Sequence, residues 1–221
     1  MVKRLKKTER MAPNDRKDAL IEATLKCLAT DGFEGLSTRK ISAEAGVAIG
    51  LINHHFASKE DLVAQAYEHL TLSHLDIVKA AVAAADTDAR SQLSAYLRAM
   101  LTPPVVDPGA LRAWVVFWAM MERGNALGAV FDRTYADYRS FLEDILRRLA
   151  VSSGIPLLDL KLTAIGLLAL LDGLWIVGGL DPDSCSSEEA IRLAEAWVDA
   201  LVQGKVRDVV LEKYRLVEPT S

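Results

Sequence analysis

The chain has 221 residues, which is enough for one large domain or for a small domain followed by a larger one. Its composition, 51% hydrophobic and 25% charged, favours a globular protein with an apolar core and argues against a disordered chain. Cys27 and Cys185 lie far apart and show no metal-ligand spacing, which argues against a disulfide framework or a zinc site and favours a reducing, cytoplasmic location.

The first segment, residues 1–14, is predicted to be a basic flexible arm. Residues 1–17 hold seven lysines and arginines against two acidic residues, although the whole chain has a net charge of −4. Such a local excess suits contact with phosphates, but by itself it is more typical of a solvated tail. No apolar segment follows, so we do not expect a secretory signal.

The rest of the chain is predicted to be helical throughout. A first helix covers about 15–30 and ends at Asp31-Gly32, and a long helix begins at Ser58, capped by Ser58 with Asp61 reaching back, and runs to about 85. Further helices are expected at about 89–101, 110–123, 129–151, 157–180 and 187–203. The predicted class is all-α, with a three-helix helix-turn-helix domain at 15–70 and a larger helical domain at 71–221 for ligand binding and dimerisation.

The stretch 36–56 has the pattern of a helix-turn-helix. Ser37 or Thr38 can cap a short helix, Gly46 allows a sharp turn, and a second helix follows with Ile52 and Phe56 on its inner side. The second helix of such a unit enters the major groove. The predicted DNA-binding residues are Thr38, Arg39, Lys40, Ala48, Ile49, Gly50, Leu51, Asn53, His54, His55 and Lys59.

The chemistry of these residues suits contact with the major groove of DNA. Gly50 and Ala48 permit close approach, whereas Asn53 and His54 can hydrogen-bond base edges or phosphates. Leu51 can contact a thymine methyl group, and the basic residues that flank the unit can bind phosphates. The alternative is a generic three-helix core with no role in DNA binding.

The run Gly35–Leu62 resembles the DNA-binding domain of the TetR family. The matching positions are Ile41, Ala45-Gly46-Val47, Gly50, His54, Phe56 and Ser58-Lys59-Glu60-Asp61-Leu62. The resemblance implies a homodimer that binds a palindromic operator and releases it when a small molecule enters the C-terminal domain. It also implies that Lys59 contacts a phosphate.

A narrower resemblance points to the BetI branch of that family, the repressors of choline-to-glycine-betaine genes. It rests on Arg112–Ala119, Leu170–Trp175, Ile21–Leu25 and Gly50–Phe56. Two features depart from the pattern: Leu51-Ile52-Asn53 stands where many relatives have Thr-Leu-Tyr, and the segment Ile176-Val177-Gly178 after Trp175 has no basic residue. The departures concern the effector, for which the resemblance implies choline or a related quaternary ammonium.

Aromatic side chains gather in the C-terminal part of the chain, as a cage for a quaternary ammonium would require. Ordinary core packing explains aromatic residues at helical spacing equally well. Asp172 can serve as a countercharge, or as a hydrogen-bond acceptor at a subunit contact. The predicted ligand-binding residues are Trp114, Phe117, Trp118, Met121, Phe131, Tyr135, Asp172 and Trp175.

Residues 162–180 are apolar enough for a membrane span, but Asp172 lies at their middle, where a charge in lipid is costly. We expect instead a soluble helix that is buried partly in its own domain and partly in a subunit interface. The helices at about 157–180 and 187–203 are predicted to pair with their copies in a four-helix bundle.

No catalytic or cofactor motif is found: the sequence has no HExxH, GxSxG, Walker A or GxGxxG pattern. We therefore predict no catalytic residues, no metal and no cofactor, and a protein that is not an enzyme. The competing hypothesis is a small all-helical enzyme or carrier whose helix-turn-helix is merely structural.

Overall fold

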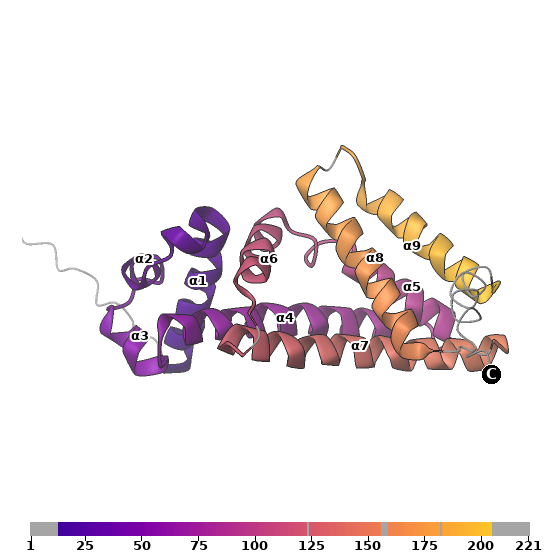
Figure 1. Cartoon of the computed structure of the whole chain (residues 1–221), viewed down its shortest axis with the longest axis horizontal. Helices are drawn as coiled ribbons and strands as arrows, with labels where there is room; N and C mark the ends of the chain where they lie inside the picture. The colour runs from indigo at the N-terminus through magenta and orange to yellow at the C-terminus, as the bar shows by residue number, and fades with distance from the viewer. Residues whose placement is uncertain (1–12, 123, 156–158, 182, 205–221) are drawn as a thin grey trace, which may run out of the picture. The chain divides into compact units, whose positions relative to one another are not determined.

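The structure is a computed structural model that describes residues 13–122, 124–155, 159–181 and 183–204. It therefore describes no side chain of the predicted basic arm, and any helix after residue 204 lies outside the described residues. Every element in the described part is a helix, in agreement with the predicted all-α class (Figure 1). The helices are α1 Pro13–Gly35, α2 Thr38–Glu44, α3 Gly50–His55, α4 Lys59–Ala84, α5 Ala89–Met100, α6 Pro108–Met120, α7 Ala126–Ser153, α8 Leu160–Leu180 and α9 Ser187–Val202.

These helices form two compact units. The first unit holds residues up to Leu70 together with 112–130, and the second holds 71–111 together with the chain from Phe131 onward. The division inside α4 falls between Leu70 and Thr71. The segment 112–130, by contrast, belongs to the first unit, although it comes later in the chain.

Each unit has its own apolar core. In the first unit the buried side chains include Leu20, Ile41, Ile52, Phe56 and Leu62, so all of α1 to α4 contribute. In the second unit the core draws on α4, α5, α7, α8 and α9, and its fully buried members include Leu93, Tyr96, Leu97, Leu142, Ile145 and Leu167. A side chain of this size contributes about 1.5–3 kcal/mol when it leaves water, so these clusters stabilise both units.

Local capping sets where the helices begin. Ser37 accepts a hydrogen bond from the Lys40 N–H at 3.3 Å, which settles in favour of Ser37 the choice of cap that the sequence left open. Ser58 accepts from the Asp61 N–H at 3.1 Å, as predicted. The Asp61 carboxylate reaches back one residue further than expected, and accepts from the Ala57 N–H at 2.9 Å.

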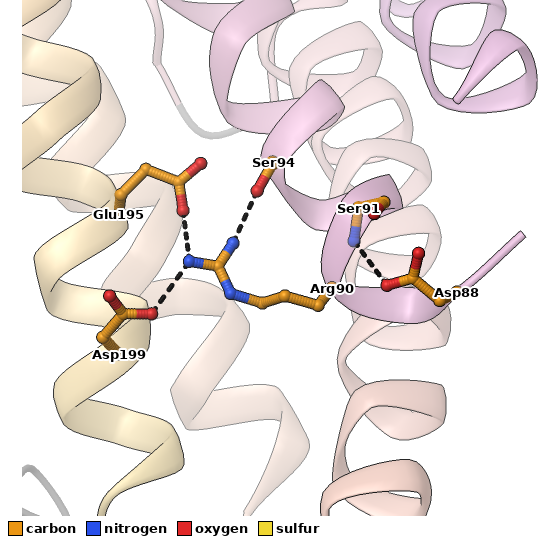
Figure 2. Close-up of polar contacts among 6 residues, drawn as sticks. All are labelled: Asp88, Arg90, Ser91, Ser94, Glu195 and Asp199. Atoms are coloured by element: carbon orange, nitrogen blue, oxygen red, sulfur yellow. Dashed lines mark hydrogen bonds and ion pairs between the residues drawn. The ribbon is translucent and has the colours of Figure 1, made fainter. Parts of the chain in front are cut away.

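A charged contact ties α5 to α9. The Arg90 guanidinium donates to Asp199 at 2.8 Å and pairs with Glu195 at 2.5 Å (Figure 2). Arg90 also donates to Ser94 within α5, and Asp88 caps that helix by accepting from the Ser91 N–H (Figure 2). One side chain thus holds two helices that are far apart in sequence.

Helix α8 is the segment that the sequence marks as apolar enough to span a membrane. Among the described helices it is the one that is long and apolar enough to cross a membrane, and 22% of its apolar stretch is buried. Its buried residues, Ala164, Leu167, Leu168, Leu171 and Trp175, lie on one side of the helix. The opposite side is therefore apolar but uncovered in the single chain.

Candidate nucleic-acid interface and ligand-binding residues

The predicted helix-turn-helix is present as α2, a tight turn and α3. Gly46 has a φ of 65°, in the left-handed region that a side chain disfavours. The turn is held by two backbone bonds, from the Gly46 N–H to the Ala43 carbonyl at 3.2 Å and from the Val47 N–H to the Ser42 carbonyl at 3.0 Å. The glycine thus allows the chain to reverse direction between the two helices.

Helix α3 has two different faces. Its inner side chains are almost fully buried, with 1% of Ile52 and 4% of Phe56 exposed. Its outer side includes Ile49, which is 51% exposed although it is a large apolar residue. Asn53 and His54 are also exposed, and Leu51 and His55 are half-buried. The outer face is therefore apolar and lightly charged, and it is free for a partner.

Gly50 begins α3, and its backbone is open to the outside. A Cβ atom built at this position meets nothing within 4 Å. Ala48 is likewise exposed. The packing of this chain therefore gives no reason for a glycine at position 50.

The basic residues around α2 and α4 differ in their partners. Arg39 is exposed and makes no ion pair with any residue that the structure describes. Lys40 pairs with Asp31 at 3.3 Å. Thr38, half-buried, is the first residue of α2, so its N–H lies at the positive end of that helix.

Lys59, the first residue of α4, is held by a ring that the sequence analysis did not identify. Its ammonium group lies 4.6 Å from the centroid of the Phe33 ring, at the end of α1. A second ammonium, that of Lys17, lies 5.8 Å from the ring of Phe56. Phe33 and Lys59 are separated by 26 positions along the chain, and no local pattern links them.

Four of the predicted ligand-binding residues lie in the first unit. There the ring of Tyr67, on α4, meets both Trp114 and Phe117 edge-on, each at 5.1 Å between centroids. Trp118 follows at 6.0 Å from Trp114. Phe117 is fully buried, whereas Trp114, Trp118 and Met121 are half-buried. This aromatic cluster packs as a core, and its role in ligand binding stays a prediction.

The other four lie in the second unit. The rings of Phe131 and Tyr135 stack at 5.4 Å on α7. Burial raises the pKa of Asp172, on α8, to about 6. This carboxylate in turn raises the pKa of Tyr135, after burial, which is the larger cause. Asp172 and Tyr135 are therefore neighbours, although they are 37 positions apart.

Trp175, the last of the predicted ligand-binding residues, lines a cavity in the second unit. The cavity has a volume of about 220 Å³ and lies between the loop before α6, the C-terminal half of α8 and the start of α9. Its walls are mostly apolar, with Leu101, Leu111 and Leu174 among them, and Asp107 and Cys185 add polar atoms. Within the described residues, no group of three His, Cys, Asp or Glu side chains is placed to hold a metal ion.

One face of α8 is apolar and exposed. It is a stripe at helical spacing, in which three small residues lie between larger apolar ones: Leu162, Gly166, Ala169, Gly173, Val177 and Leu180. Helix α9 packs beside α8 and adds Leu193, which is 54% exposed (Figure 1). We name these seven residues the α8–α9 stripe.

Two family models match this chain. Residues 20–66 match the model described as bacterial regulatory proteins of the tetR family. Residues 89–203 match the model for the C-terminal part of BetI-type transcriptional repressors. Both models describe transcriptional regulators, in agreement with the prediction that the chain is not an enzyme.

Curated relatives and solved structures agree with these matches. The HTH-type transcriptional regulator BetI of Pseudomonas fluorescens (strain Pf-5) is 29% identical over 185 residues, which are 83% of this chain and 91% of the relative. BetI of Burkholderia cenocepacia (strain HI2424) is 26% identical over 187 residues, 85% and 94% of the two chains. A crystal structure assigned to a transcriptional regulator of Pseudomonas aeruginosa PAO1 is 44% identical, with a TM-score of 0.84 over 90% of this chain and 96% of that one.

One further solved structure is similar in fold. It comes from Saccharomonospora viridis, was obtained in complex with choline, and has a TM-score of 0.72 at 20% identity, over 84% of this chain and 96% of that one. At this level of identity the similarity concerns the fold.

Proposed function

Because this chain belongs to the TetR family of bacterial regulatory proteins, and is a transcriptional repressor of the BetI type, we propose that it acts as a homodimer on a palindromic operator and is released by a small-molecule effector. The observation that carries the proposal is the outer face of α3, where Ile49 and Asn53 are exposed above the buried Ile52. Apolar and hydrogen-bonding side chains exposed together on the outer side of the second helix suit the edges of bases in a major groove.

On DNA, α3 is the reading helix. Asn53 and His54 offer hydrogen-bonding groups for base edges, and Ile49 and Leu51 offer apolar contacts for thymine methyl groups. Arg39, Lys40 and Lys59 bind phosphates on either side of the groove, and the N–H groups at Thr38 add to these contacts. Since phosphate contacts release counterions, the affinity of the protein should fall steeply with salt.

The α8–α9 stripe is the proposed dimer interface. Its residues are apolar and exposed in the single chain, and its glycines and Ala169 allow a second helix to come close. Pairing two copies of α8 and α9 forms a four-helix bundle and covers this face. A dimer also matches the two-fold symmetry of a palindromic operator.

The proposed effector is choline or a related quaternary ammonium ion. Three observations support this class: the BetI-type family match, the choline bound to the related fold from Saccharomonospora viridis, and the aromatic and acidic side chains of the second unit. A protein that controls transcription in this way works in the cytoplasm, as the sequence analysis expects.

The test of the proposal is binding of fluorescent DNA from the region next to the protein's own gene, measured as anisotropy over a salt series. We expect sequence-dependent affinity that falls with salt, and loss of binding in Lys59→Glu without loss of folding. Lys79→Glu makes the same charge reversal at an exposed position of the second unit and should change little. Equal affinity for unrelated DNA at every salt concentration would refute the proposal.

A further inference from the structure

The end of α1 touches two of the three basic residues that are proposed to bind phosphates. The ring of Phe33 faces the ammonium group of Lys59, and the carboxylate of Asp31 pairs with the ammonium group of Lys40 at 3.3 Å. A ring leaves the positive charge of its lysine intact, whereas a carboxylate offsets it. The third basic residue, Arg39, makes no ion pair among the described residues. Lys40 is therefore the member of this set whose charge is opposed by a neighbour.

The backbone at the end of α1 leaves space for this ion pair. Gly32, with a φ of 65° and a ψ of −171°, interrupts the helical conformation directly after Asp31. At Gly35, an added Cβ atom would lie 2.6 Å from the Cβ atom of Asp31 and 3.8 Å from the Nζ atom of Lys40. Even a methyl group at position 35 would thus displace the Asp31 side chain. The local sequence accommodates the contact of Asp31 with Lys40.

Protein stability does not account for this ion pair. Both side chains are exposed, and an exposed ion pair contributes little to the free energy of unfolding because water screens it. The two charges matter more when DNA approaches, because each phosphate attracts Lys40 and repels Asp31. To bind a phosphate with its full charge, Lys40 has to leave Asp31. The carboxylate therefore opposes one phosphate contact in each subunit.

We propose that Asp31 limits the affinity of the protein for DNA by restraining Lys40, so that an effector can still reverse operator binding. This inference rests on the proposed function, because it concerns the strength of that same DNA binding. An effector changes the affinity for the operator by a fixed factor, which is the coupling between the two sites. A repressor that binds too tightly therefore stays on its operator even when the effector is saturating. Asp31 is in this sense a positioning residue, which acts through Lys40.

The experiment measures the anisotropy of fluorescent DNA with the full-length protein, on DNA next to the protein's own gene and on unrelated DNA of equal length. In Asp31→Asn, Lys40 is free to bind a phosphate in each subunit of the dimer. At about 50 mM salt we expect binding about tenfold tighter than that of the wild type. The logarithm of the affinity should also fall more steeply with the logarithm of the salt concentration, by about two in slope. Because every sequence has the same phosphates, both DNAs should gain by the same factor.

Further variants show whether Lys40 carries the effect. Asp31→Ala should give the same gain, because it also removes the carboxylate. The double variant Asp31→Asn/Lys40→Gln should bind no more tightly than Lys40→Gln alone, because no freed lysine remains. The matched control is Glu44→Gln, which removes one negative charge from the other ion pair between α1 and α2, that of Glu44 with Lys26. Lys26 is not among the proposed phosphate-binding residues, so the salt slope should stay that of the wild type. Urea titration of each variant shows whether it is folded.

Three results would overturn the proposal. In the first, Asp31→Asn binds DNA as the wild type does or more weakly, which would mean that the carboxylate has no effect or orients Lys40 towards the phosphate. In the second, the gain persists in the double variant, so that it does not depend on Lys40. In the third, Glu44→Gln gives the same gain and the same slope, so that only the net charge matters.

The same titrations separate this inference from the proposed function. If the wild type prefers the DNA next to its own gene but Asp31→Asn shows no gain, the repressor stands and the role of Asp31 is wrong. If the wild type binds both DNAs equally at every salt concentration, the operator-binding function is wrong. The gain of Asp31→Asn on unrelated DNA then still decides whether Asp31 restrains Lys40.

Discussion

The ammonium group of Lys59 lies 4.6 Å from the centroid of the Phe33 ring, so the end of α1 positions the first residue of α4. Such a contact contributes about 0.5–1 kcal/mol at an exposed site. We predict that Phe33→Leu lowers operator affinity about two- to fivefold, because Lys59 loses its orienting partner. Phe33→Tyr keeps the ring and should retain the wild-type affinity. Unchanged anisotropy titrations for Phe33→Leu would show that Lys59 acts without this ring.

Substitution by alanine should lower the stability of the protein at Gly46 but its affinity for the operator at Gly50. Gly46 has a φ of 65°, so Gly46→Ala should lower the free energy of unfolding by about 1–2 kcal/mol in urea titrations. Gly50 is helical and its Cβ would meet nothing within 4 Å, so Gly50→Ala should not lower stability. We expect Gly50→Ala instead to weaken operator binding at least about tenfold, because the methyl group occupies the space of the DNA backbone or bases. Full affinity in a folded Gly50→Ala protein would argue against close approach at this point.

A charge in the α8–α9 stripe should separate the dimer. Val177 and Leu193 are 46% and 54% exposed in the single chain, and Val177→Asp or Leu193→Asp would bury a charge in the proposed interface. Analytical ultracentrifugation should then show a monomer, with weaker operator binding as a consequence. Val151→Asp is the control, because Val151 is 79% exposed on α7, outside the stripe. A wild-type protein that sediments as a monomer at micromolar concentration would contradict the interface.

Replacing Arg90 should lower the free energy of unfolding more than replacing Arg192, an arginine with one weak partner. Arg90 joins α5 to two carboxylates of α9 (Figure 2). Arg192, by contrast, faces Glu189 at 4.0 Å and is 76% exposed. Because Arg90 is still 35% exposed, solvent screens its ion pairs, and we expect Arg90→Met to cost only about 1–2 kcal/mol of unfolding free energy. Arg192→Met should change stability by less than about 0.5 kcal/mol. Equal melting temperatures for the two variants would mean that the α5–α9 contact adds no stability.

His74 should make the protein sensitive to mild acid. Burial lowers the pKa of His74 to about 4, from an ordinary value of 6.5, so the unfolded chain binds the proton more readily than the folded one. Above about pH 6.5 this histidine is neutral in both states and does not lower the free energy of unfolding. As the pH falls from there towards 4, the unfolded chain takes up the proton and the free energy of unfolding falls. In His74→Gln the unfolding free energy should therefore fall less steeply over this window, as urea titrations at a series of pH values can measure.

Asp172 acts in the opposite direction within nearly the same window. Its pKa is raised from 3.8 to about 6, so the folded protein binds the proton more readily, and its contribution to stability is lost as the pH rises from about 4 to 6. Asp172→Asn removes this penalty, so the variant should be more stable than the wild type at pH 7, on the order of 1 kcal/mol because the side chain is only partly buried. A profile for Asp172→Asn that equals that of the wild type would show that the carboxylate is well solvated.

Much of the fold was predictable because helices depend on local pattern. The predicted helix from Ser58 to about 85 is α4 at Lys59–Ala84, and the helix predicted at 187–203 is α9 at Ser187–Val202. The break at Gly32 also appears, as a residue with a φ of 65° inside α1. Each of these boundaries depends on a capping residue, a glycine or a proline and on the next few positions, all of which a single sequence displays.

The two faces of α3 were predictable for the same reason. Ile52 and Phe56 are four positions apart and both are buried, whereas Asn53 and His54 fall on the outer side. Helical periodicity alone therefore separated the inner residues from the candidate reading residues. The ligand-binding residues were harder, because aromatic side chains at helical spacing fit a core and a binding cage equally well.

The sequence by itself determined the all-helical class, the helix-turn-helix with its outer face, and the resemblance to TetR-type repressors, because these depend on short-range patterns and on motifs in register. Only the tertiary structure decided that Trp114 and Phe117 pack against Tyr67, and that the Tyr96 hydroxyl is buried near Asp172 without a hydrogen-bond partner among the described residues. Tyr96 and Asp172 are 76 positions apart in the sequence. Their proximity follows from how α5 and α8 pack in the core of the second unit. Burial, which makes the Tyr96 hydroxyl costly to leave unpaired, exists only after that packing.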